Sequence, residues 1–244
     1  MEENKNPAIY NKLWQQLEVI ELDFGPSWEI IREFQEKAIL EIGPGHLPRI
    51  PIKQGYFIDS SRVAVEQLRL LGGQVLYEDG SCVINQLPKE FFDLVVAWDV
   101  LEHIPNDLQA LQAINRILKK DGYFLVAVPI RMLYFGASDS HNGHYRRYEP
   151  EELIKKFTEA GFKIVKWREG GFLSWLYSFA FMRSQARRPV LLVDNFPGFL
   201  IKIAIKLSVW FEKLTHGKWQ TKPMASINKN KRLTRLEILY KKCD

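Results

Sequence analysis

The chain has 244 residues, of which 46% are hydrophobic and 26% charged, and a formal net charge of +5. These values are typical of a folded globular protein that can bury a large core, and they exclude a collagen, a coiled coil or a largely disordered chain. The two cysteines lie far apart and no run of 18 uncharged apolar residues occurs, so we expect neither a disulfide framework nor a membrane span.

The positive charge is concentrated at one end of the chain. Residues 1–169 carry 20 basic and 25 acidic side chains, whereas residues 170–244 carry 14 and 4. A basic, aromatic segment of this kind is either a solvated face on structural helices or a surface for an anionic partner. The acidic, polar N-terminus does not resemble a secretory signal, so we expect a cytoplasmic protein, with peripheral contact at the inner membrane surface through residues 171–215 as an option.

Short apolar runs alternate with amphipathic segments in the central part of the chain, a pattern typical of a parallel sheet with crossover helices. We expect a helical N-terminal segment at 1–36, followed by a core at 37–169. The strands predicted in this core are residues 38–42, 55–59, 75–79, 91–98, 122–129 and 162–167.

Three helices are predicted between these strands. The first begins at Ser60 or Ser61 and ends at a pair of glycines, and the second begins at Asn106 or Asp107 and ends at Lys119 and Lys120. The third begins around Pro150 and ends at Gly161.

The C-terminal third is harder to assign. We expect residues 170–230 to form a basic, aromatic, helical insertion that can cover the active site. We expect residues 231–244 to return to the sheet as an antiparallel last strand.

A glycine-containing loop follows the first predicted strand. In the sequence ILEIGPG, Glu41 ends a buried strand, and Gly43 and Gly45 allow the backbone to approach a ligand closely. Asp59 ends the second strand, where a carboxylate can accept hydrogen bonds from ribose hydroxyls, and Asp79 with Gly80 ends the third. Several carboxylates at one sheet edge indicate a nucleotide-like ligand, and one with a positive centre.

These segments resemble the class I S-adenosylmethionine-dependent methyltransferases from about residue 38 to 167. The similar stretches are ILEIGPG, YFIDSS, YEDGS, FDLVVAWDVLEHIPND, INRILKKDGYFLVAVP and HNGHYRRYEPEELIKKFTEAGF. The resemblance implies a doubly wound α/β fold with a mostly parallel seven-stranded sheet in the order 3-2-1-4-5-7-6. It implies S-adenosyl-L-methionine as cofactor, bound by Glu41, Gly43, Gly45, Asp59, Ser60, Asp79, Gly80 and Trp98.

The chain departs from the family pattern in one place. Leu47 stands where a third glycine is usual, and Pro48 and Pro51 interrupt the expected crossover helix. Only nine residues separate Gly45 from Gly55, so we expect this crossover to lack a full helix.

Two histidines are candidates for the catalytic base, His103 after the fourth strand and His144 after the fifth. Substrate contact is predicted for His141, Arg146, Arg147 and Tyr148. The alternative for the arginines is ion pairing with the EPEE turn. His141 and His144 have no third His or Cys nearby in the sequence and match no standard zinc spacing, so we expect no metal.

We therefore expect a methyltransferase that acts on a small or lipid-linked or glycan metabolite, at oxygen rather than carbon. One alternative is a non-catalytic S-adenosylmethionine-binding scaffold. An NAD-dependent oxidoreductase is a second alternative, with less support, because GPGHLP lacks the last glycine of the dinucleotide fingerprint. A nucleic-acid substrate is not expected, because WDVLEH stands where a base-methylating enzyme would carry its asparagine-proline-proline-tyrosine motif.

Overall fold

The structure, a computed structural model, describes residues 18–21, 27–77, 83–170, 217–224 and 234–243, together with residues 11, 203, 206, 207 and 210. Its centre is a seven-stranded sheet in the order β3-β2-β1-β4-β5-β7-β6. The strands are β1 (Ile39–Ile42), β2 (Tyr56–Ile58), β3 (Gln74–Tyr77), β4 (Phe92–Trp98), β5 (Leu118–Pro129), β6 (Phe162–Glu169) and β7 (Arg235–Lys242). Strands β1 to β5 pair in parallel, and β7 pairs antiparallel with both β5 and β6. The expected fold class, strand order and antiparallel last strand are confirmed.

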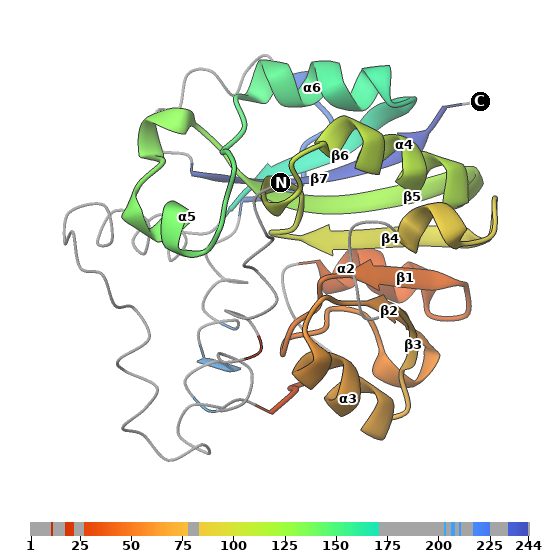
Figure 1. Cartoon of the computed structure of the whole chain (residues 1–244). Coiled ribbons are helices and arrows are strands. Elements are labelled where there is room, and N and C mark those ends of the chain that lie inside the picture. The colour runs from red at the N-terminus through yellow and green to blue at the C-terminus, as the bar shows by residue number, and fades with distance from the viewer. Residues whose placement is uncertain are drawn as a thin grey trace.

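Helices cover both faces of the sheet (Figure 1). On one face lie α4 (Asp107–Ile117) and α6 (Pro150–Glu159), and on the other lie α2 (Trp28–Ile31), the 3-10 turn η1 (Arg32–Phe34) and α3 (Arg62–Leu70). Successive strand residues point to opposite faces, so each strand contributes to two cores. In β4, Val95 and Ala97 join the α4/α6 core, while Leu94 and Val96 join the other.

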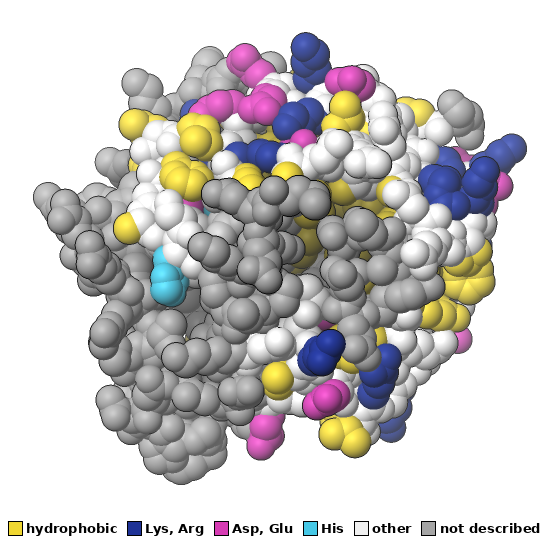
Figure 2. All heavy atoms as spheres, in the orientation of Figure 1, with side chains coloured by type: hydrophobic (Ala, Val, Ile, Leu, Met, Phe, Trp, Pro, Cys, Tyr) yellow, Lys and Arg dark blue, Asp and Glu magenta, His cyan; other side chains and the backbone are white. Residues whose placement is uncertain are grey.

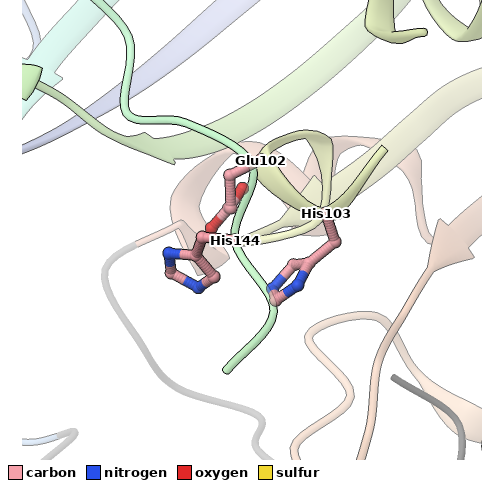
Figure 3. Close-up of side chains that lie close together, drawn as sticks. All are labelled: Glu102, His103 and His144. Carbon is pink, nitrogen blue, oxygen red and sulfur yellow. The ribbon is translucent and has the colours of Figure 1, made fainter. Parts of the chain in front are cut away.

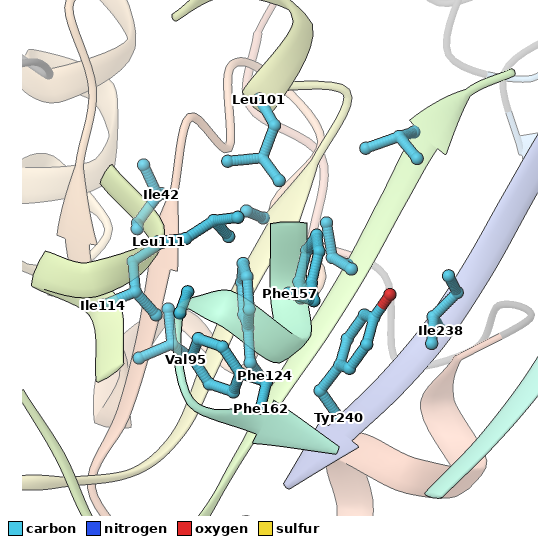
Figure 4. Close-up of a cluster of buried hydrophobic side chains, with 14 of the residues drawn as sticks. Ile42, Val95, Leu101, Leu111, Ile114, Phe124, Phe157, Phe162, Ile238 and Tyr240 are labelled. Atoms are coloured by element: carbon cyan, nitrogen blue, oxygen red, sulfur yellow. The ribbon is translucent and has the colours of Figure 1, made fainter. Parts of the chain in front are cut away.

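The larger core lies between the sheet and the pair α4 and α6. Phe157 from α6 stacks on Tyr240 from β7 at a centroid separation of 3.9 Å, and Phe124 from β5 packs beside them (Figure 4). Each of these aromatic side chains is almost fully buried. Because β7 supplies Tyr240 and Ile238 to this core, the returning strand is integral to the fold.

The helix boundaries follow the predicted caps in two cases and differ in a third. Ser61 caps α3 by accepting from the amide of Ala64, and Pro150 is the first residue of α6. Asn106 caps α4, but this helix ends at Ile117, not at Lys120. The expectation was wrong because Leu118 already has an extended backbone and pairs with Phe92, and Lys119 binds Asp93 at 2.7 Å instead of capping the helix.

The expected absence of a full first crossover helix is confirmed, since only the 3-10 turn η2 (Ile52–Gln54) connects β1 to β2. Most of the N-terminal segment and of the insertion at 170–230 lies outside the described residues, so these two domain assignments stay predictions. Residues 217–224 run beside β6, where Gln220 pairs with Trp167. Among the described residues, none of the helices has both the length and the hydrophobicity that a membrane crossing requires.

Candidate active site

The glycine loop lies at the carboxyl end of β1, as predicted. Gly43 and Gly45 both adopt left-handed backbone angles, with φ of +66° and +56°. A Cβ at position 43 would lie 2.7 Å from Val100 Cγ2, so the backbone of the loop after β1 packs directly against a side chain of the loop after β4. Only glycine adopts this conformation in this space without strain.

Glu41 is fully buried at the base of this loop. Its Oε2 accepts hydrogen bonds from the amides of Arg49 and Ile50, at 2.8 and 3.2 Å. Burial raises the pKa of the Glu41 carboxyl to about 7, and the neighbouring Arg49 opposes this shift. Through these two amide hydrogen bonds Glu41 holds the short crossover that stands in place of the family's helix. Its other oxygen, Oε1, has no hydrogen-bond partner in the structure.

Asp59 joins the glycine loop to the end of β2. Its Oδ2 accepts from the amide of Gly45 at 2.9 Å, and its Oδ1 accepts from the amide of Ser61 at 2.8 Å. Burial raises the pKa of the Asp59 carboxyl, and these amide hydrogen bonds oppose the rise. Each carboxylate oxygen can accept a second hydrogen bond, so this positioning role is compatible with the predicted ribose contact.

Trp98, the last residue of β4, has two arginine side chains near its ring. The guanidinium of Arg49 lies 4.7 Å from the centre of the Trp98 ring and that of Arg235 lies 5.5 Å from it. The next residue, Asp99, has a φ of +54° and pairs with Arg235 at 2.6 Å. Residues 99–103 thus follow directly after β4, at the carboxyl end of that strand.

Two histidines and a glutamate lie close together just after β4 (Figure 3). Glu102 and His103 belong to the 3-10 turn η4 (Leu101–His103), and His144 follows the short helix α5 (Ala137–His141). The two imidazole rings meet edge to face with their centres 4.5 Å apart. The two catalytic candidates chosen from the sequence are thus neighbours.

His144 is held by a carboxylate. Its Nδ1 lies 2.8 Å from Asp139 Oδ1, and Asp139 also accepts from Arg147 Nε at 2.9 Å. A hydrogen bond of this kind fixes the ring orientation and directs Nε2 away from Asp139. His103 differs, because burial and the nearby His144 lower its pKa to about 3, so its imidazole is neutral at physiological pH.

Three of the predicted substrate contacts are engaged within the protein. Tyr148 is 1% exposed and donates its hydroxyl to Asp107, and its role as a substrate contact stays a prediction. Arg146 binds Asp107 at 2.8 Å and Arg147 binds Asp139. The arginines therefore pair with these two aspartates and not with the EPEE turn. Arg146 joins the 131–148 loop to α4, whereas Arg147 pairs within that loop. His141, the fourth candidate, is exposed.

The structure also locates the remaining cofactor candidates. Ser60 is half-buried beside Asp59, whereas Asp79 and Gly80 lie outside the described residues. The proximity of His103 to His144 was not predicted, because the two residues are 41 positions apart and no local spacing indicates that they meet. The orienting role of Asp139 was missed as well, although its position five residues before His144 was a usable signal.

Residues 29–166, more than half of the chain, match the methyltransferase domain family. The chain belongs to the S-adenosylmethionine-dependent methyltransferases. A curated relative from Mycolicibacterium smegmatis, described as a probable S-adenosylmethionine-dependent methyltransferase, is 28% identical over 109 residues. The match covers 44% of this chain and 42% of that relative, so the chain spans less than half of the relative's length.

Solved structures of methyltransferase fold align over most of the chain. The [4+2]-cyclase SpnF aligns with a TM-score of 0.58 and 16% identity, over 98% of this chain and 96% of that one. A possible histamine N-methyltransferase from Thermotoga maritima aligns with a TM-score of 0.51 and 18% identity, over 88% and 92%. At these identities the alignments establish the fold of this methyltransferase and nothing about its acceptor.

S-Adenosylmethionine is the cofactor of this family. The described part of the site suits this cofactor. Nucleotide-like ligands bind at the carboxyl ends of the strands in open α/β sheets. At that edge lie the left-handed glycine loop after β1, the Asp59 carboxylate after β2 and the Trp98 indole at the end of β4. When bound, the cofactor supplies an electrophilic methyl group on a sulfonium.

Proposed function

We propose that the chain transfers the methyl group of S-adenosylmethionine to an oxygen of a small or lipid-linked or glycan metabolite. The hydrogen bond between Asp139 and His144 is the observation that carries this proposal. A hydroxyl acceptor must lose its proton as it attacks the methyl group, and a carboxylate-oriented imidazole is a common general base. Because Nδ1 of His144 is bound to Asp139, Nε2 is the nitrogen left to accept the proton.

His103 is a poor candidate for the base. Its pKa of about 3 means that the ring stays neutral but has little affinity for a proton at physiological pH. We therefore assign proton removal to His144 and a shaping role beside the methyl group to His103. The remaining contribution of the protein is alignment of the hydroxyl with the sulfonium and exclusion of water.

The test is an acceptor screen with S-adenosylmethionine labelled in its methyl group. Hydroxylated acceptors (phenols, methyl glycosides and polyprenyl-phosphate-linked sugars) are compared with matched amines, and the methylated atom is identified by mass spectrometry and NMR. We expect methyl ethers as products. A label on nitrogen or carbon would contradict oxygen transfer, and cofactor binding without any methylated product would favour the non-catalytic scaffold.

The His144→Gln variant tests the base directly. We expect kcat to fall by about 10²-fold or more with little change in cofactor affinity, because general acid-base groups contribute at this level to the chemical step. Asn142→Ala, in the same loop, is the control for a general disturbance of residues 131–148. Full activity of His144→Gln would exclude His144 as the base.

A further inference from the structure

The cluster of Glu102, His103 and His144 has the composition of a metal site. One ligand atom from each residue, a carboxylate oxygen and two imidazole nitrogens, lies within 4.8 Å of the other two. The side chains come from two separate loops and point toward one another (Figure 3). We propose that these three residues bind a divalent transition-metal ion.

The state of Glu102 supports this proposal. Its side chain is fully buried, and neither carboxylate oxygen has a hydrogen-bond partner in the structure. A buried carboxylate without partners is costly, and such groups are rare unless an ion or another ligand satisfies them. A metal ion between Glu102 and the two histidines would supply the missing partner.

The surroundings of His144 provide the outer support that metal ligands need. Asp139 binds Nδ1 of His144, and Asp139 is itself held by Arg147 and by the amide of Gly136 at 2.9 Å. A ligating histidine usually donates its second nitrogen to a carboxylate, which orients the ring and raises its basicity. The His103 ring packs edge to face against the His144 ring, with the ring centres 4.5 Å apart.

The donor set also selects the class of metal. Two imidazoles with one carboxylate suit Zn²⁺, Fe²⁺ and related transition metals, whereas Mg²⁺ and Ca²⁺ prefer oxygen ligands alone. Bonds of about 2.1 Å place ligand atoms about 3–3.5 Å apart, so small side-chain rotations would close the site. Three protein ligands leave coordination positions open for an exogenous group.

An acceptor oxygen is the group that fits this open position, and this second part of the inference rests on the proposed methyl transfer. A bound metal lowers the pKa of a coordinated hydroxyl, which then releases its proton to water. The resulting oxygen attacks the methyl carbon, the carbon–sulfur bond breaks, and S-adenosylhomocysteine leaves with the electron pair. In the metal-bound state the metal therefore takes over proton removal from His144, whose Nε2 cannot both bind the metal and accept a proton, while the proposed transfer to oxygen is unchanged.

The sequence-based expectation of no metal considered His141 and His144 alone. His141 is exposed on α5 and takes no part in the cluster. The partners of His144 come instead from η4, about 40 positions earlier in the chain. His141 therefore provides a matched control for His144.

The test is Zn²⁺ binding to the full chain after treatment with EDTA, without S-adenosylmethionine and in excess Mg²⁺. Calorimetry and elemental analysis after gel filtration should give one Zn²⁺ per chain. We expect Glu102→Gln and His144→Ala each to weaken binding by about 100-fold or more, and His141→Ala to leave it unchanged. Co²⁺ should give a visible absorption spectrum that Glu102→Gln removes.

Glu102→Gln keeps the side-chain volume and removes the ionisable carboxyl. The variant should therefore fold at least as stably as the metal-free wild-type chain, as measured by thermal unfolding. Absence of stoichiometric Zn²⁺ binding would overturn the proposal, as would equal binding by Glu102→Gln. Methyl transfer that persists in EDTA would leave the proposed function intact with His144 as base. Metal binding without any methyl transfer would instead overturn the proposed function alone.

Discussion

Substitution of Gly43 tests whether the conformation of the glycine loop determines cofactor affinity. Its φ of +66° costs an alanine about 1–2 kcal/mol, and the added Cβ would lie 2.7 Å from Val100. Relief of this contact must separate the loops after β1 and β4, which border the cofactor site. We therefore expect Gly43→Ala to weaken S-adenosylmethionine binding by about tenfold or more, measured by calorimetry.

Gly72→Ala is the matched control for the backbone effect. Gly72 has a φ of +90° just after α3, and an added Cβ would meet only Lys53 at 3.7 Å. This variant should lose a similar amount of stability from the left-handed backbone and keep full cofactor affinity. Equal loss of affinity in both variants would show that destabilisation, not the loop, is responsible.

At the scale of the elements, a buried ion pair connects strand β7 to its neighbour β6. Arg168 from β6 and Glu237 from β7 lie opposite each other, and Arg168 Nε donates to Glu237 at 2.6 Å. Both residues are buried, and Ser27, which precedes α2, bonds to both. The pair thus joins the N-terminal segment to the returning strand.

Removal of one partner leaves the other charge buried. We expect Glu237→Ala to lower the free energy of unfolding by about 3–5 kcal/mol, measured by urea denaturation. The double change Arg168→Met with Glu237→Leu should recover most of that loss, because apolar side chains of similar volume replace both charges. A double variant less stable than Glu237→Ala would contradict this account.

Charge is distributed unevenly over the whole molecule. Lys and Arg side chains lie among Asp and Glu side chains on the described part of the face shown in Figure 2. The excess of basic residues belongs to residues 170–244, most of which lie outside the described part. Peripheral membrane contact and a lid over the site therefore stay predictions.

The fold was predictable because its signals are local. Apolar runs mark β1, β4 and β5, Ser61 and Asn106 mark helix starts, and the strand order followed from the family resemblance. The glycine loop at the sheet edge was predictable for the same reason. Side-chain partnerships were not, because Tyr148 and its partner Asp107 are brought together only by the packing of the 131–148 loop.

Binding of S-adenosylmethionine to the wild-type chain tests the central claim most directly. Calorimetry with S-adenosylmethionine, S-adenosylhomocysteine and NAD should give dissociation constants in the micromolar range for the first two and no heat for NAD. This result would establish S-adenosylmethionine, and not NAD, as the cofactor of the chain. Binding of NAD without S-adenosylmethionine, or of none of the three, would contradict the account.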